Sequence, residues 1–164
     1  MNYNDLQKNL KGKFGKEIKE DSEFRGELTI VVNSDSIDKI LKFMKTDKSL
    51  SFNFLSSVTA VDFVKERNVF EVVYHLLSMD NNIRVRIKAE VPADKPELPS
   101  ATSVYKSANW FEREAYDMFG INFLGHPDLR RIMNPEDFPG HPLRKDFDGR
   151  AKDEYCPVPI IDTK

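Results

Sequence analysis

The strongest constraint in this sequence is a strict alternation of apolar and charged residues at positions 82–91. The apolar residues are Ile83, Val85, Ile87 and Ala89, and the charged residues between them are Arg84, Arg86, Lys88 and Glu90. Because successive side chains of a β-strand point to opposite faces, this period of two predicts a strand with one buried and one solvated face. Such a strand is typical of an antiparallel sheet that covers a core on one side only.

Three other segments have the pattern of strands, at residues 27–32, 51–62 and 69–77. Turn-forming residues at 79–81 join the last of these segments to residues 82–91 and predict a β-hairpin. A chain with four such segments needs a helix to cover the apolar face of the sheet.

Two segments have the spacing of helices. Residues 35–45 place apolar side chains three or four positions apart, and residues 3–12 place Leu6 and Leu10 on one face. The order of elements predicts an α+β fold, an antiparallel or mixed sheet with helices on one face. We assign this sheet domain to residues 1–100.

Prolines at positions 92, 96 and 99 end the strand pattern, because proline has no backbone N–H to donate to a sheet. We expect a short helix at 100–105 and a longer one at 109–119. Gly120 is expected to end the longer helix, since glycine tolerates the left-handed conformation common at that position.

The side chains of the longer helix suggest how it is oriented. Asn109 and Glu112 have the spacing of a capping box. An apolar face that includes Phe111 predicts packing on the sheet. Arg113 and Asp117, four residues apart, are expected on the opposite, solvated face.

From residue 121 onward the apolar periodicity disappears and prolines become frequent. Two short sequences echo each other, GHPDLR at 125–130 and GHPLR at 140–144. Each joins a bend favoured by glycine and proline to an arginine, whose planar group offers five donors to carboxylates. We therefore predict that residues 101–164 form a helix and an extended arm that binds a partner protein.

The candidates for this docking are polar residues of the helix and the arm. They are Glu112, Arg113, Glu114, Asp117, His126, Asp128, Arg130, Arg131, His141, Arg144, Lys145 and Asp146.

The same region allows a second interpretation, a stand-alone metal-dependent enzyme. His126 and His141 could bind a metal together with acids such as Glu114 and Asp128, or act as a general base. The two histidines lie 15 residues apart and lack the i,i+4 spacing of a helical zinc motif, which favours docking. The aromatic residues around Trp110 could stack on a quinone, although packing explains them more simply.

The composition and the spacing of the glycines argue against several other classes of function. The single cysteine, Cys156, cannot supply a disulfide framework or a cysteine-ligated zinc or iron–sulfur site. The glycines form no phosphate loop or dinucleotide fingerprint, so no NADH, flavin or ATP site is expected.

His75 lies in a strand pattern and is expected to be structural. The net charge of −2 gives no reason to propose nucleic acid as a partner. We expect neither a secretory signal nor a membrane span.

Four motifs between residues 109 and 147 resemble those of a known family. They are NWFEREAYDMFGI at 109–121, GHPDLRRI at 125–132, PEDF at 135–138 and GHPLRKDF at 140–147. The chain resembles the 30-kDa subunit of respiratory complex I, the NADH-quinone oxidoreductase. Shorter matches occur at 59–62, 74–78 and 99–100, whereas residues 1–50 match only in the order of elements.

The resemblance implies a peripheral scaffold subunit of an NADH:quinone oxidoreductase that has no catalytic site or cofactor of its own. The whole complex would carry FMN, iron–sulfur clusters and quinone, and would couple electron transfer to proton translocation. The implied neighbours are the quinone-site subunit and the small iron–sulfur subunits, on the cytoplasmic side of the cell inner membrane.

Two points stay open after this resemblance. Related ion-pumping hydrogenases and other donor-linked quinone reductases use similar subunits. After residue 147 the sequence departs from the longer aromatic and arginine-containing tail of many members, which puts the last docking contacts in doubt.

Overall fold

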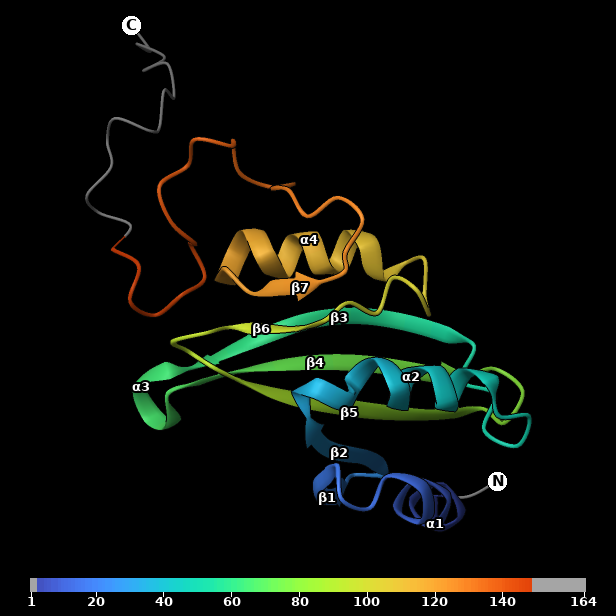
Figure 1. The fold of residues 1–164 in the computed structure, drawn as a ribbon. Coiled ribbons are helices and arrows are strands. Elements are labelled where there is room, and N and C mark those ends of the chain that lie inside the picture. Colours follow the sequence, from blue (N-terminus) through green and yellow to red (C-terminus); the bar gives the residue numbers. More distant parts are fainter. Residues whose placement is uncertain (1–2, 149–164) are drawn as a thin grey trace, which may run out of the picture.

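The computed structural model of the protein describes residues 3–148 and contains a five-stranded mixed sheet (Figure 1). Its strands are β1 (Ile18–Phe24), β2 (Glu27–Asn33), β3 (Phe54–Phe63), β4 (Val69–Ser78) and β5 (Ile83–Pro92). Across the sheet they follow the order β1-β2-β5-β4-β3. β2 and β5 run parallel, and the other neighbouring strands run antiparallel. The predicted α+β class with a mixed sheet is confirmed.

Helices precede and follow the strands along the chain. They are α1 (Tyr3–Phe14), α2 (Ile37–Thr46), α3 (Val64–Arg67) and α4 (Ala108–Phe119), with a 3₁₀ turn, η1 (Ser34–Ser36), before α2. Two short strands, β6 (Glu97–Pro99) and β7 (Asn122–Leu124), form a separate parallel pair. Figure 1 shows α2 in front of the sheet, over β4 and β5, and α4 beside β3, with the chain after β7 passing over α4. Within residues 3–148, no helix combines the length and apolar character that a membrane span needs.

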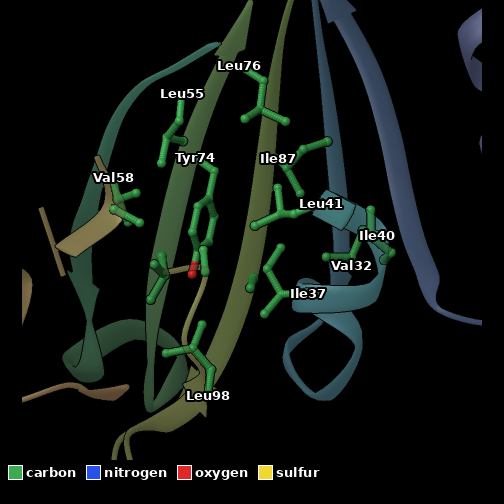
Figure 2. Close-up of a cluster of buried hydrophobic side chains, with 14 of the residues drawn as sticks. Val32, Ile37, Ile40, Leu41, Leu55, Val58, Tyr74, Leu76, Ile87 and Leu98 are labelled. Carbon is green, nitrogen blue, oxygen red and sulfur yellow. The ribbon is translucent and has the colours of Figure 1, made fainter. Parts of the chain in front are cut away.

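One face of the sheet builds the core. The register places Ile30, Ile87 and Tyr74 side by side on β2, β5 and β4, and these side chains have almost no exposed surface. α2 covers this face with its apolar side, and Figure 2 shows Leu41 and Ile37 in the same cluster as Ile87. α1 and α4 add buried side chains to the same core.

The opposite face carries the charged half of the alternation. Lys88 of β5 pairs with Glu71 of β4 at 2.8 Å, and Arg67 approaches the same carboxylate at 3.5 Å. Arg67 also pairs with Glu90 at 2.7 Å. The Lys88–Glu71 pair joins two strands, and Arg67 of α3 adds to it. These ion pairs shield a face that no helix of residues 3–148 covers in the way that α2 covers the core face.

Three features differ from the sequence expectations. The apolar pattern gives no sign of β1, because this edge strand has one paired side and a largely polar sequence. The expected helix at 100–105 is wrong, since residues 101–104 form bends and turns. The main sheet ends at Pro92 as expected, but Pro99 lies in β6, where it ends a strand of three residues.

Ile87→Ala tests the assignment of the two faces. The truncation leaves a cavity in the core, so we expect the free energy of unfolding in urea to fall by about 2–5 kcal/mol. The control is Val61→Ala, whose side chain is 38% exposed on β3, and we expect it to cost less than about 1 kcal/mol. Equal losses in the two variants would contradict the assignment.

Candidate docking site on α4 and the arm

The start of α4 differs from the prediction. The capping box of Asn109 and Glu112 is wrong, because the helix begins one residue before Asn109 and has no side-chain cap. Glu112 points inward instead, where its carboxylate accepts hydrogen bonds of 2.6 Å from the Ser100 hydroxyl and from the Ala101 N–H. The turn that precedes α4 is therefore fastened to the helix by the residue expected to cap it.

Glu112 is fully buried among groups that do not neutralise it. Burial raises the pKa of its carboxyl to about 7, while the hydrogen bonds from Ser100 and Ala101 act in the opposite direction. The Tyr74 hydroxyl is also buried, and within residues 3–148 it has no hydrogen-bond partner. Burial, and then the nearby Glu112 carboxylate, raise the pKa of Tyr74 well above its ordinary value.

Asp117 fixes the course of the arm, which we define as residues 121–148. Its Oδ1 accepts hydrogen bonds from the Arg131 guanidinium at 2.8 Å and from the Asn134 side-chain amide at 2.9 Å. Its Oδ2 accepts the N–H groups of Ile132, Met133 and Asn134 at 2.7–3.0 Å. Burial alone would raise the pKa of this carboxyl, but the hydrogen bonds prevail and hold the pKa well below its ordinary range.

Arginine side chains extend this anchoring to the carbonyl groups of the arm. Arg131 donates to the carbonyls of Phe138 and Gly140, both at 3.0 Å. Arg113 on α4 donates to the carbonyls of Arg130 and Arg131 at 3.1 and 3.0 Å. Each guanidinium thus donates hydrogen bonds to more than one backbone carbonyl in a segment without secondary structure.

Gly120 and His141 close the C-terminal end of α4. Gly120 has a φ of 77°, the left-handed conformation predicted for it. The His141 ring packs so closely that a Cβ on residue 120 would come within 2.7 Å of it. His141 Nδ1 donates to the Asp117 carbonyl at 2.9 Å, and the Leu143 N–H donates to the Met118 carbonyl at 3.1 Å. These donors satisfy helix-terminal carbonyls that lack partners within the helix.

Asp62, near the end of β3, holds the arm a second time. Its Oδ1 accepts the N–H of Val64 and its Oδ2 accepts the N–H of Lys145, both at 2.8 Å. The Lys145 ammonium also pairs with Glu66 of α3 at 2.9 Å. Asp62 was not among the docking candidates, although it ends the 59–62 motif that resembles the family.

Other candidates lie nearer the surface. Arg144 forms a two-bonded pair with Asp146, with both bonds at 2.9 Å. Arg130 pairs with Asp128 at 2.9 Å, and both side chains are more than half exposed. Glu114 is exposed on α4.

The histidines of the arm bind groups of their own chain. His126 Nδ1 accepts the N–H of Asp128 at 3.0 Å, so its Nε2 carries the proton and donates to the Asn109 carbonyl at 3.2 Å. His141 binds the end of α4 as described. In the part of the chain that the structure describes, no group of three or more His, Cys, Asp or Glu side chains could hold a metal ion, so the metal-enzyme interpretation gains no support.

The structure thus separates the docking candidates by exposure. Glu112 and Asp117 are fully buried, so neither offers a surface to a partner in this conformation. The expected solvated position of Asp117 is wrong, because the arm covers that side of α4. Arg131 is turned inward with a side chain 13% exposed. The exposed candidates are Glu114, Asp128, Arg130, Lys145 and Asp146. Residues 149–164, with Cys156, lie outside the described residues.

Comparison with known proteins agrees with the sequence motifs. The family described as the respiratory-chain NADH dehydrogenase 30 Kd subunit matches residues 30–153. An NADH-quinone oxidoreductase subunit of Citrifermentans bemidjiense is 46% identical over 138 residues, which cover 84% of this chain and 84% of that protein.

Two solved structures are similar to this fold. The trypsin-resistant fragment (1-134) of Nqo5 has a TM-score of 0.62 and 34% identity, covering 76% of this chain and 98% of the fragment. A chain in the structure of the membrane-bound sulfane sulfur reductase, an archaeal respiratory membrane complex, has a TM-score of 0.77 and 29% identity. That match covers 91% of this chain and 87% of the other.

Asp117→Asn should loosen the arm, because it removes the charge that pairs with Arg131. Breaking a buried ion pair costs about 3–5 kcal/mol, and limited proteolysis should cut the variant faster within residues 121–148. The folded-state pKa of Asp117 lies below the unfolded value. Its stabilisation is therefore present at neutral pH and lost as the pH falls below about 4. The variant should lack this part of the acid dependence.

The control for this variant is Asp128→Asn, which removes an exposed pair and should cost no more than about 1 kcal/mol. If Asp117→Asn were as stable and as resistant to protease as the wild type, the anchoring role of Asp117 would be wrong.

Glu112→Gln should change the pH dependence in the opposite direction. The folded-state pKa of Glu112, about 7, lies above its ordinary value of 4.5, so the contribution of Glu112 to stability is greatest below pH 4.5 and is lost as the pH rises through 7. The neutral variant should be more stable than the wild type at pH 8 by roughly 1–3 kcal/mol in urea. The exposed Glu114→Gln serves as the control, and the same gain in both variants would refute this explanation.

Proposed function

This chain belongs to the family of the respiratory-chain NADH dehydrogenase 30 Kd subunit, and we propose that it docks the quinone-site subunit of an NADH:quinone oxidoreductase as a peripheral scaffold. It contacts the small iron–sulfur subunits as well. The chain itself binds no cofactor, and FMN, the iron–sulfur clusters and quinone belong to other subunits. It supports electron transfer from NADH to quinone, coupled to proton translocation, on the cytoplasmic side of the inner membrane.

The observation that carries this proposal is the apolar surface of α4 and the arm. Eight large hydrophobic residues are exposed in residues 3–148, and four of them lie in this short region. They are Trp110, Leu124, Met133 and Leu143. Trp110 lies beneath the Arg113 guanidinium, 5.3 Å from the ring centre. Exposed apolar side chains beside a cation are typical of the centre of a protein interface, where tryptophan and arginine are enriched.

The anchoring of the arm supports docking for a second reason. Asp117 holds the backbone of the arm to α4, and Asp62 holds it to β3, before any partner arrives. A segment that is already ordered loses less conformational entropy on binding, so more of the contact energy remains as affinity.

A second candidate is the equivalent subunit of a complex with another electron donor. The structural likeness to a chain of a sulfane sulfur reductase complex favours this candidate, because a chain with a similar fold is part of that complex. The higher identity to subunits named for NADH favours the first candidate. Assaying the purified complex with NADH as the electron donor, and with alternative donors in parallel, separates the two.

Trp110→Ala and Arg130→Glu should weaken assembly without unfolding the chain, since both side chains are 62% exposed. We expect each variant, tagged and expressed in the native host, to recover at least about tenfold less quinone-site subunit and NADH:quinone reductase activity from detergent-solubilised membranes. Charge reversal at Arg131 would not test docking, because that side chain holds the arm.

Phe24→Ala is a matched control for Trp110→Ala. Phe24 is 70% exposed at the end of β1 and, like Trp110, lies beneath an arginine side chain. Its recovery should equal that of the wild type. Full assembly of both the Trp110 and Arg130 variants would sink the docking proposal.

A further inference from the structure

The outer face of the sheet holds a pocket that the docking proposal does not use. Its volume is about 440 Å³, within the usual range for sites that bind small molecules. Its walls include His75, Arg84, Arg86 and Glu27, and the hydroxyl-bearing Ser57. None of these residues lies on α4 or on the arm.

The register explains why these groups meet. Ser57 of β3 pairs with His75 of β4, and His75 pairs with Arg86 of β5, so the three side chains form a row on one face. Arg84 lies two residues along β5 on the same face. A register shift between Leu55 and Ser57 adds an extra residue to β3 here, and such bulges often re-aim side chains beside sites.

The cationic side chains of the pocket differ in whether they already bind other groups of the chain. Arg86 donates to the Glu27 carboxylate at 2.8 Å and to the Thr29 hydroxyl at 3.1 Å. Among residues 3–148, the side chains of Arg84 and His75 form no hydrogen bond or ion pair with the rest of the chain. Two donors that suit an anion are therefore available at one wall.

The charges of the pocket select the kind of anion. With His75 neutral, two arginines against one glutamate leave a single positive charge. Burial and then the charge of Arg86 lower the pKa of His75, the Glu27 carboxylate acts in the opposite direction, and Lys88 lowers the pKa further. The balance disfavours a protonated His75 unless an anion enters. Glu27 would repel a dianion more strongly than a monoanion. A planar guanidinium such as that of Arg84 binds a carboxylate through two parallel hydrogen bonds.

We infer that this pocket binds a single carboxylate group, held by the Arg84 guanidinium and by the ring N–H of His75. The Ser57 hydroxyl is placed to donate a third hydrogen bond. The carboxylate comes either from a small soluble acid or from an acidic side chain of a neighbouring subunit, and the chemistry of recognition is the same in both cases.

The first experiment uses the full-length chain alone and therefore does not depend on the docking proposal. Titration with benzoate, followed by two-dimensional NMR, should shift the amide signals of residues 56–57, 75 and 84–86 and raise the pKa of His75. Inorganic phosphate should bind more weakly. Arg84→Gln should weaken benzoate binding at least about tenfold, and His75→Gln should remove its pH dependence. Lys42→Gln, an exposed charge on α2, should change neither.

The second experiment identifies the source of the carboxylate in the assembled complex. Arg84→Lys keeps the cation and adds an amine that a carbodiimide can couple to a carboxylate in ion-pair contact. A crosslink from residue 84 to an acid of another subunit supports the side-chain source, whereas benzoate binding without such a crosslink supports a soluble acid. The inference is overturned if the chain neither binds benzoate nor gives such a crosslink, or if Arg84→Gln binds benzoate as tightly as the wild type.

Discussion

The buried ion pair between Asp117 and Arg131 decides where the C-terminal part of the chain lies. The arm begins with β7, a strand of three residues whose Phe123 is buried in the core, but residues 125–148 contain no helix or strand, so no sheet ladder holds that stretch. The entropy of ordering such a segment must be offset by a few strong contacts. Asp117 supplies them, because one carboxylate satisfies three consecutive backbone N–H groups as well as the guanidinium. The guanidinium then reaches two more carbonyls, and the path of the arm follows.

Glu112 and Asp117 show that burial alone does not set the sign of a pKa shift. The two carboxyls lie five positions apart on α4, and neither has exposed surface. Glu112 receives two hydrogen bonds and no cation, so the cost of desolvation prevails. Asp117 receives five hydrogen bonds, one of them from Arg131, and its charged form prevails. One carboxyl therefore ties the helix to the turn before it, and the other ties the helix to the arm.

Local periodicity predicts the parts of this fold that are set by local rules. The alternation at 82–91 gave β5 almost to the residue, and Gly120 marks the end of α4. The partners of Asp117 and Glu112 could not be predicted in this way, because they depend on which segments pack on α4. The motif resemblance singled out the arm, but spacing could not tell that Arg131 turns inward while Arg130 stays exposed. Sequence reasoning also missed the pocket on the outer face, since its row of side chains exists only once the strands are in register.

The strand order also bears on how the protein is made. β2 lies beside β5, and the bond between Thr29 and Arg86 joins residues 57 positions apart. β3, β4 and β5 follow one another as an antiparallel meander with short connections, which closes loops at low entropic cost. During synthesis, β2 leaves the ribosome with only β1 as a pairing partner, because β5 is made later. We therefore expect the meander to form first and the N-terminal hairpin to join it last, so the first fifty residues stay vulnerable to misassembly until the sheet is complete.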